Sequence, residues 1–245
     1  MGMGYEEVAD LIRARIESGD LAPGARVPSE PQVRADYGVS RDTASKALRL
    51  LKEEGLTEGR QGAPTRVRKF QPVRRHANRR LSQEAWGAGV SLWGIDVLEE
   101  KTEVDGLEID RIEAPPRIAE ALAISRGQSV VRRSRRYLIK KKPVMYAQSY
   151  LPADIAAGTQ IEDSDTGPGG IYARLADLGH APARFREEVR SRMPTKAQRE
   201  LLDIGRGTPV ILLARTAKTG EGRIVEVNEM VLDSASFILD YTVEA

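Results

Sequence analysis

The sequence predicts an α+β protein with a small helical N-terminal domain and a larger C-terminal domain built on an antiparallel sheet. Residues 5–55 contain three segments with the apolar spacing of amphipathic helices, each bounded by capping residues or glycine. From residue 92 onward the pattern changes to strands with short helices between them. The 245 residues accommodate two modest domains or one large one, and we expect domains at 1–69 and 81–245.

The first expected helix covers residues 5–18. Apolar side chains recur at Val8, Leu11, Ile12 and Ile16, the spacing of an amphipathic helix, and Gly19 ends the segment. This spacing predicts a helix that packs one side against a core.

The second expected helix begins after Ser29, a favourable N-cap residue. Pro31 falls in the first turn, where its missing N–H costs nothing, and Gln32 completes a capping box. The helix runs to about Tyr37 and ends at Gly38.

The third expected helix is capped by Ser40, runs to Glu54 and stops at Gly55. Its inward face should carry the apolar residues Ala44, Ala47, Leu48 and Leu51. Its outward face should carry Arg41, Thr43, Ser45, Lys46 and Arg49.

Two short helices joined by a glycine-containing turn, the second starting with arginine and small polar residues, are typical of a helix-turn-helix. The second helix of this motif enters the DNA major groove, where Arg41 can bind guanine in bidentate fashion. Strands at 56–58 and 65–67 predict a hairpin wing that contacts the minor groove or phosphates. The alternative is a three-helix structural module with a hairpin.

The charge distribution supports a polyanionic partner for the N-terminal domain. The whole chain has a net charge of +2, but residues 1–80 hold 16 basic and 11 acidic residues. Residues 60–80 hold eight basic residues and no acidic one. We expect residues 70–80 to be an interdomain linker, whose arginines either contact phosphates or belong to a solvated tether.

The C-terminal domain is expected to contain a largely antiparallel sheet. Candidate strands are 92–100, 128–140, 143–151, 184–193, 208–217, 223–232 and 236–243, and candidate helices are 115–123, 169–178 and 195–203. One face of a strand carries Arg133 and Arg135, and one face of another carries Glu226 and Asn228. These faces either line a ligand cleft or form cross-strand charge pairs on a solvent-facing sheet.

The N-terminal motifs resemble the DNA-binding domain of the GntR family of bacterial transcription regulators. They are Gly19-x-Leu21-x-Pro23-Gly24-x-x-x-Pro28-Ser29-Glu30, Val39-Ser40-Arg41-x-Thr43 and Leu50-x-x-Glu53-x-Gly55-Leu56. The resemblance implies a homodimer on a short inverted-repeat operator in double-stranded DNA. It implies DNA contacts from Ser29, Glu30, Ser40, Arg41, Thr43, Ser45, Lys46, Arg49, Gly62 and Thr65.

Two departures from the family pattern concern the operator. Pro31 stands where many relatives have a DNA-contacting arginine, and the wing sequence contains Pro64 where relatives have glycine. Proline has no N–H and cannot adopt positive φ, so the backbone contact of the wing is not expected at this position.

Residues 80–243 resemble the UTRA effector domain of the HutC subfamily, whose fold is similar to chorismate lyase. The matching stretches are Arg132–Arg135, Pro143–Val144, Ser149–Pro152, Gly170–Leu175, Gly207–Val210 and Val225–Asn228. The resemblance implies an effector site at Arg133, Arg135, Tyr137, Gly170, Tyr172, Glu226 and Asn228. Counting back from Pro143 makes either Arg135 and Tyr137 or Arg133 and Arg135 the anion-binding pair, and Ala147 replaces the glutamate of some amino-sugar sensors.

We therefore expect a DNA-binding transcription regulator, a repressor, whose operator affinity changes when a small anionic metabolite binds. The alternatives are a lyase-like enzyme and a constitutive DNA-binding protein. The chain has two histidines and no cysteine, and no nucleophile–base or metal-ligand spacing is visible, so we expect no catalytic residue, metal or cofactor. No apolar run reaches membrane-spanning length and no signal peptide is visible, so we expect a cytoplasmic protein.

Overall fold

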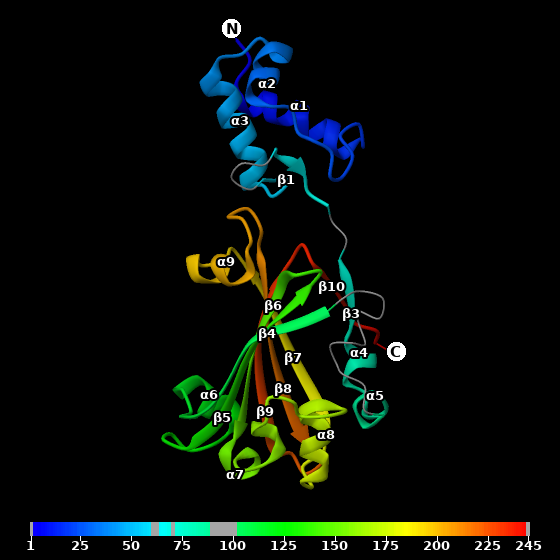
Figure 1. Cartoon of the computed structure of the whole chain (residues 1–245), viewed down its shortest axis with the longest axis vertical. Coiled ribbons are helices and arrows are strands. Elements are labelled where there is room, and N and C mark those ends of the chain that lie inside the picture. Colours follow the sequence, from blue (N-terminus) through cyan, green and yellow to red (C-terminus); the bar gives the residue numbers. More distant parts are fainter. Residues whose placement is uncertain (1, 60–63, 70–71, 89–101, 244–245) are drawn as a thin grey trace. The chain divides into compact units, whose positions relative to one another are not determined.

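The computed structural model describes residues 2–59, 64–69, 72–88 and 102–243 (Figure 1). The chain divides into two compact units, one containing the residues up to Gln71 and the other most of the chain from Pro72 onward. Each unit is described by itself below.

The first unit contains the three helices and the hairpin strands that the sequence predicts. They are α1 (Tyr5–Glu17), α2 (Glu30–Tyr37), α3 (Arg41–Glu53), β1 (Thr57–Glu58) and β2 (Arg66–Val67), with β1 antiparallel to β2. The buried core consists of Val8, Ala9, Ile12, Leu21, Val27, Val33, Ala44, Ala47, Leu51 and Val67. The predicted inward faces of α1 and α3 therefore pack, with the exception of Leu11, which is 44% exposed.

Both short helices of this unit begin at the predicted capping residues. The backbone N–H of Ser29 donates to Gln32 Oε1 at 2.8 Å, and the N–H of Thr43 donates to Ser40 Oγ at 3.1 Å. Gly38 closes α2 with φ of +65°, a conformation that glycine adopts without strain. These local signals fix where α3 starts and which residues occupy its first turn.

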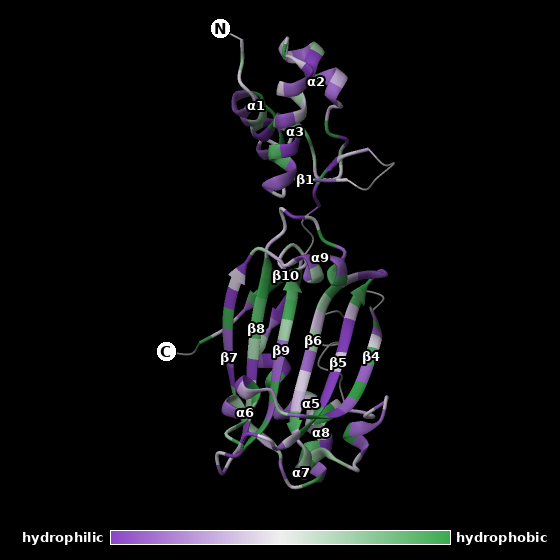
Figure 2. Ribbon diagram, turned by 90° about the vertical axis from the view of Figure 1, so that its left-hand side faces the viewer, coloured by the Kyte–Doolittle hydropathy of each residue, from purple (hydrophilic) through white to green (hydrophobic). Residues whose placement is uncertain are grey.

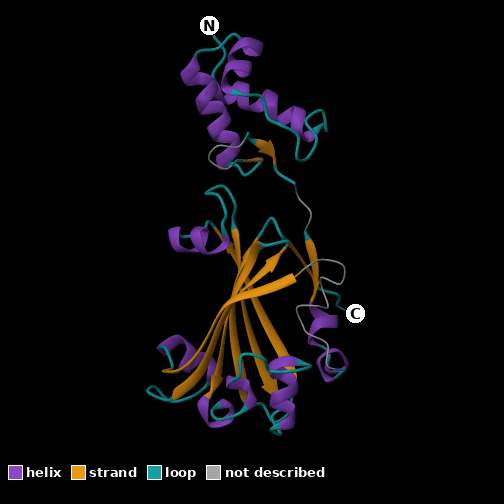
Figure 3. Ribbon diagram, in the orientation of Figure 1, coloured by secondary structure: helices purple, strands orange, loops and turns teal. Residues whose placement is uncertain are grey.

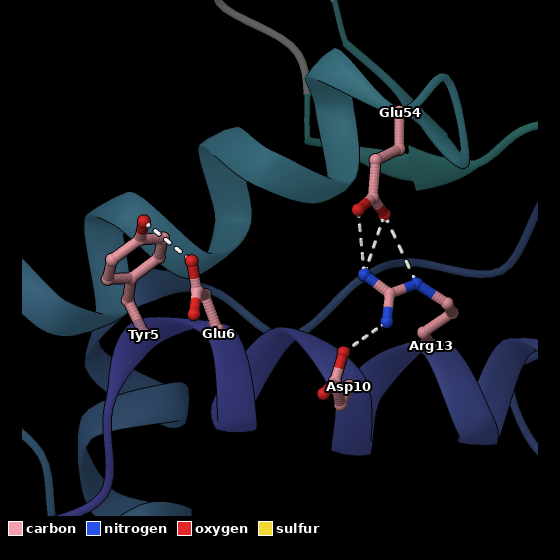
Figure 4. A network of polar contacts seen from close by, with 5 residues as sticks. All are labelled: Tyr5, Glu6, Asp10, Arg13 and Glu54. Atoms are coloured by element: carbon pink, nitrogen blue, oxygen red, sulfur yellow. Dashed lines mark hydrogen bonds and ion pairs between the residues drawn. The ribbon is translucent and has the colours of Figure 1, made fainter.

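An ion-pair network joins the middle of α1 to the end of α3 (Figure 4). Nη2 of Arg13 lies 2.7 Å from Oε1 of Glu54, and its other nitrogens contact Glu54 and Asp10. These carboxylates raise the pKa of Arg13. The network holds the C-terminal end of α3 against α1 and so helps to fix the orientation of α3 within the unit.

The second unit is built on a six-stranded antiparallel sheet with strand order β4-β5-β6-β9-β8-β7 (Figure 3). The strands are β4 (Thr102–Glu113), β5 (Ser129–Ile139), β6 (Lys142–Pro152), β7 (Pro182–Arg192), β8 (Val210–Thr219) and β9 (Ile224–Asp233). A separate two-stranded sheet pairs β3 (Val73–His76) in parallel with β10 (Phe237–Asp240). The antiparallel α+β architecture predicted for this domain is confirmed.

Short helices and one 3₁₀ turn complete the unit. They are α4 (Ala77–Leu81), α5 (Gln83–Gly87), α6 (Pro116–Leu122), α7 (Ala153–Ala156), η1 (Gln160–Glu162), α8 (Gly170–Asp177) and α9 (Lys196–Leu202). Helices α6, α7 and α8 lie at one end of the sheet, and α9 lies at the other (Figures 1 and 2). The predicted helices at 115–123, 169–178 and 195–203 correspond to α6, α8 and α9.

The sequence did not predict strand β4, and the strand expected at 92–100 lies outside the described residues. The pairing of β4 with β5 shifts register between Asp105 and Glu108, where Gly106 has φ of +58°. This bulge interrupts the alternation of apolar residues that identifies a strand in a sequence.

The expected linker also differs from the structure. Residues 73–76 form β3 and residues 77–81 form α4, so the second half of the 70–80 segment belongs to the C-terminal unit. The pairing with β10 is a contact between segments about 160 residues apart, which local sequence patterns do not reveal. Part of the segment expected to be a tether is therefore folded as a strand and a helix of the larger domain.

Candidate nucleic-acid interface and ligand cavity

The outward face of α3 is polar and accessible. The side chains of Arg41, Lys46 and Arg49 are 80%, 45% and 66% exposed. Ser45 is also exposed, and Thr43 is half-buried beside the capping hydroxyl of Ser40. The predicted division of α3 into a packed face and an exposed polar face therefore agrees with the geometry.

Arg41, Lys46 and Arg49 each lie beside a carboxylate of their own unit. Nε of Arg41 lies 2.9 Å from Oε1 of Glu30, and the Lys46 Nζ lies 2.7 Å from Oδ2 of Asp42. Arg49 forms a longer pair with Glu53, at 3.7 Å. Exposed pairs of this kind contribute little to stability, so phosphates or base edges can replace the carboxylates.

The remaining predicted DNA contacts have structural roles or lie outside the described chain. Ser29 and Ser40 cap α2 and α3, and the carbonyl oxygen of Thr65 accepts from the Val27 N–H at 2.9 Å. Gly62 lies outside the described residues. A capping hydroxyl at a helix N-terminus is still close to the surface, where a phosphate oxygen can approach.

The second unit encloses a cavity of about 370 Å³ on one face of its sheet. All seven residues expected to contact an effector line this cavity, namely Arg133, Arg135, Tyr137, Gly170, Tyr172, Glu226 and Asn228. Strand β5, which lies between the edge strand β4 and β6, carries a long hydrophilic stretch (Figure 2). Strand alternation turns Arg133, Arg135 and Tyr137 toward the cavity.

The opposite face of β5 has a different role. Arg132 contacts Asp110, with Nη2 and Oδ2 2.5 Å apart, and Arg136 contacts Asp105 at 2.7 Å between the same atoms. Both acidic residues lie on the neighbouring strand β4. The face that carries Arg133 and Arg135 therefore lines a cavity, and the cross-strand charge pairs lie on the opposite face, for which the sequence made no prediction.

Arg135 and Tyr137 form one polar wall of the cavity. Arg135 donates from Nε to the Tyr137 hydroxyl, and its guanidinium carbon lies 5.4 Å from the centre of the tyrosine ring. Burial lowers the pKa of Arg135, but Tyr137 and the carboxylate of Glu226 raise it by more. The guanidinium therefore stays charged, with donors available for an anion.

Arg133 binds the protein backbone instead of pointing freely into the cavity. Its Nη1 donates to the carbonyl oxygens of Ile161 and Asp163 at 2.5 Å and 2.6 Å. Burial, with repulsion from Arg135, lowers the pKa of Arg133 to about 10, so the side chain remains charged at neutral pH. Arg133 thus holds the segment that follows η1 against the sheet.

A hydrogen bond between Tyr172 and Glu226 forms a second polar wall. The Tyr172 hydroxyl donates to Glu226 Oε2 at 2.7 Å, and both side chains are buried. Burial and the charge of Glu226 raise the pKa of Tyr172, so the phenol keeps its proton. Next to Glu226 on the same strand face, Asn228 Oδ1 is a buried acceptor without a hydrogen-bond partner among the described residues. These acceptors fit ligand groups that donate, such as hydroxyls.

Helix α8 begins at the cavity in a turn of glycines. Gly169 and Gly170 have φ of +77° and +64°, and a Cβ on Gly169 would lie 2.3 Å from the Trp86 carbonyl oxygen. The close approach fixes the start of α8, and with it Tyr172 one turn later. The glycine turn therefore places backbone N–H groups at the cavity edge.

Three further arginines line the cavity that the sequence did not assign to it: Arg75, Arg80 and Arg215. Arg215 forms a buried ion pair with Glu187, with Nη2 and Oε1 2.5 Å apart, and Tyr241 donates to the other Glu187 oxygen at 2.8 Å. Arg75 and Arg80 come from β3 and α4, within the expected linker. The sequence shows them only as basic residues beside the apolar Val73 and Ala77, and the fold is needed to show that they face the cavity.

Positively charged side chains outnumber negatively charged ones in the wall of the cavity. Five arginines and two carboxylates, Asp165 and Glu226, line it. The excess of guanidinium groups favours a ligand with negative charge. The acceptor oxygens of Glu226 and Asn228 favour hydroxyl groups on the same ligand. Among the described residues no group of three or more potential metal ligands occurs.

A helix-turn-helix joined to an antiparallel domain with a polar cavity defines a class, that of transcription regulators with a separate effector domain. Residues 4–67 match the family described as bacterial regulatory proteins, gntR family, and residues 99–237 match the UTRA domain. The chain therefore belongs to the GntR family, in its UTRA-containing HutC subfamily.

Relatives along nearly the whole chain agree with this assignment. The HTH-type transcriptional regulator SCO4628 of Streptomyces coelicolor is 30% identical over 235 residues, covering 91% of this chain and 86% of that protein. The mannosyl-D-glycerate transport/metabolism system repressor MngR of Escherichia coli strain K12 is 24% identical, covering 95% and 92%. The crystal structure of a GntR-family transcriptional regulator superposes with a TM-score of 0.70 at 26% identity, covering 98% and 97%. These relatives are transcription regulators and not enzymes.

None of the helices formed by the described residues combines the length and the apolar character needed to cross a bilayer.

Proposed function

We propose that the protein is a homodimeric repressor that binds an inverted-repeat operator in the cytoplasm and is released by a small anionic metabolite. The observation that carries the effector part of the proposal is the cavity in which Arg135 faces Glu226 and Asn228. The family assignment supplies the DNA-binding part, because a winged helix-turn-helix reads the major groove with its second helix.

The DNA side of the proposal assigns base reading to Arg41 and backbone contacts to the other polar residues of the interface. Arg41 is the first residue of α3, and its side chain is more exposed than those of Lys46 and Arg49. Ser45, Lys46 and Arg49 continue the same face, and Ser29, Ser40, Thr43 and the wing residues approach phosphates. Two such helices, related by a dimer axis, read the two halves of a symmetric operator.

The effector side assigns the anion to Arg135 and the hydroxyl groups to Glu226 and Asn228. Arg133 is a poorer anchor, because its guanidinium is occupied by backbone carbonyls. The name of MngR refers to mannosyl-D-glycerate, a compound that combines a carboxylate with hydroxyl groups. A ligand of this general chemistry, an anion that carries hydroxyls, matches the charges and acceptors of the cavity.

A thermal-shift screen against hydroxylated carboxylates and phosphate esters tests the effector assignment. A compound that binds only the folded protein raises its Tm, and the true effector must also weaken operator binding. Arg135→Ala should keep the operator affinity of the ligand-free protein and lose the response. Arg136→Ala, which removes an arginine from the opposite face of β5, is the matched control and should respond normally. A full response of Arg135→Ala would show that the anchor is wrong.

Sedimentation of the protein with an operator duplex tests the dimer. We expect two chains per inverted repeat at micromolar protein concentration, because symmetric half-sites mirror a twofold axis. A monomer bound alone to the operator would contradict this part of the proposal.

A further inference from the structure

Three neighbouring residues on the cavity face of the sheet carry buried polar atoms without a hydrogen-bond partner among the described residues. These atoms are Nε of Arg133, Oγ of Ser149 and Oδ1 of Asn228. The three residues are only 2%, 0% and 7% exposed, so the atoms are shielded from bulk water. An unpaired buried donor or acceptor costs free energy, and folded proteins retain few of them. A group of three in one place therefore indicates a function.

The register of the strands places these residues in one row. Ser149 of β6 is paired with Arg133 of β5 on one side and with Asn228 of β9 on the other, and the three strands are consecutive in the sheet (Figure 2). Directly paired residues of antiparallel strands share a face, with Cβ atoms about 5 Å apart. Arg133 and Asn228 line the cavity, as does Ala147, two residues before Ser149 on the same face of β6. Ser149 therefore lies at the floor of the cavity, between two residues of its wall.

The Nε–H of Arg133 is a donor that the rest of this side chain cannot bring to a protein acceptor. Nη1 already donates to the carbonyl oxygens of Ile161 and Asp163 at 2.5 Å and 2.6 Å. Because the guanidinium is planar, these bonds also fix the direction of its Nε–H.

A second buried serine of the same two strands shows the contrast between the faces. Ser134 is 1% exposed and lies on the opposite face of the sheet, where it is paired with Gln148. Its Oγ accepts a hydrogen bond from Nε2 of Gln148 at 3.2 Å. The serine away from the cavity is thus satisfied by its cross-strand neighbour, and Ser149 is not.

A single hydroxyl group matches the three unpaired atoms together. A hydroxyl has one proton to donate and two lone pairs that accept. It can accept from Nε–H of Arg133 and from Oγ–H of Ser149, and it can donate to Oδ1 of Asn228. A carboxylate oxygen would accept the first two bonds but would place a second acceptor against Asn228, and an ammonium group would repel the guanidinium.

We propose that Arg133, Ser149 and Asn228 form a subsite for one hydroxyl group of the effector, and that Ser149 is a specificity-determining residue of the cavity. This rests on the proposed function, because the same cavity holds the effector and Arg135 holds its anionic group. Residues 133 and 135 are about 7 Å apart along β5. The effector is therefore a hydroxylated acid or phosphate ester whose hydroxyl lies several bonds away from the anionic group.

The first test uses the full-length protein without any ligand. Ser149→Ala removes an unpaired hydroxyl, whereas Ser134→Ala, the matched control, removes the hydrogen-bond partner of Gln148. Urea unfolding should show that Ser149→Ala is at least as stable as the wild type and that Ser134→Ala is less stable. An equal loss of stability in the two variants would mean that the Ser149 hydroxyl is already paired in the folded protein, which would overturn the subsite.

The second test compares two carboxylates of equal chain length, D-gluconate, which carries hydroxyls along its chain, and hexanoate, which has none. The affinity of each probe is measured from the rise in Tm with its concentration. We expect gluconate to bind the wild type more tightly than hexanoate. Ser149→Ala should weaken gluconate about tenfold, as for the loss of one hydrogen bond, and leave hexanoate unchanged. Ser134→Ala should bind both probes as the wild type does.

The outcomes separate this inference from the proposed function. If Arg135→Ala loses gluconate and Ser149→Ala binds it normally, the hydroxyl subsite is wrong and the proposed function stands. The subsite is also wrong if Ser149→Ala weakens both carboxylates alike, since Ser149 would then act through the shape of the cavity. If neither probe raises the Tm of the wild type, a hydroxylated anion is the wrong effector and the subsite falls with it.

A crystal structure of the gluconate complex identifies the group that occupies the subsite. We expect a ligand hydroxyl within hydrogen-bond distance of Nε of Arg133, Oγ of Ser149 and Oδ1 of Asn228. A water molecule that bridges the three atoms while gluconate lies elsewhere in the cavity would overturn the inference, because the row would then be a structural water site.

Discussion

Arg41 and Glu30, the first residues of α3 and α2, face each other across the turn of the helix-turn-helix, with Nε and Oε1 2.9 Å apart. The arginine side chain is 80% exposed, so little other than this carboxylate restrains it. The contact orients the guanidinium at the N-terminal end of α3. The base recognition that we propose for Arg41 would therefore depend on a residue of the preceding helix.

Arg41→Ala should weaken binding to the specific operator by roughly 1–3 kcal/mol and relax discrimination at one base pair in each half-site. The reason is the loss of a bidentate contact with a base edge. Titration of specific and random duplexes at fixed salt measures both effects. Lys46→Ala is the control, because a phosphate contact should weaken both duplexes to a similar degree. An equal loss on the two duplexes for Arg41→Ala would identify it as a phosphate contact instead.

Glu30→Gln should reduce specific binding less than Arg41→Ala, and the two changes should not add. If Glu30 acts by orienting Arg41, its substitution has little further effect once the arginine is absent. A double-mutant cycle on the operator duplex gives this coupling directly. Additive losses would show that Glu30 acts on DNA binding independently of Arg41.

The N-terminal domain could be predicted closely because its signals are local. Ser29 and Ser40 cap helices within three residues of their hydrogen-bond partners, and Gly38 ends α2 in the immediate sequence. The same holds for the arginine-rich strand, where alternation alone placed Arg133 and Arg135 on one face. These patterns do not show which residues each face of the strand contacts.

The parts of the cavity that the sequence missed depend on distant contacts. Strand β3 exists because it pairs with β10, and β4 is masked in the sequence by the bulge at Gly106. The sequence also could not distinguish the roles of Arg133 and Arg135, because the difference lies in the carbonyls of residues 161 and 163, nearly thirty residues away. Side-chain direction is readable from periodicity, but hydrogen-bond partners require the fold.

Arg133→Met should destabilise the protein more than Arg135→Met does. Losing the buried guanidinium of Arg133 leaves the carbonyls of the 161–163 segment without donors and should cost roughly 1.5–3 kcal/mol. Arg135 is half-buried and has no comparable set of backbone acceptors, so its replacement should cost less. Urea unfolding of the ligand-free variants measures the difference. Equal destabilisation by both changes would contradict the separate roles assigned to the two arginines.

The stability contributed by Glu162 should depend on pH in the acidic range. Its carboxylate contacts Arg111, with Oε1 and Nε 2.5 Å apart, and accepts from the Gly158 N–H at 2.7 Å. These interactions lower the pKa of Glu162 from its ordinary 4.5 to about 2. Because the folded state binds this proton less readily than the unfolded chain, the contribution is complete above pH 4.5 and is lost as the pH falls toward 2.

Glu162→Gln should therefore be less stable than the wild type at neutral pH, with a gap that closes between pH 4.5 and pH 2. The gap should be small, since Arg111 is largely exposed and solvent screens the pair. Urea unfolding at a series of pH values measures it, and Arg111→Gln should follow the same pH profile because it removes the other partner. The consequence extends to the cavity, because Glu162 and the carbonyl oxygens bound by Arg133 lie on one short segment. A gap that is independent of pH would mean that Glu162 acts through packing, and that its charge does not hold this segment in place.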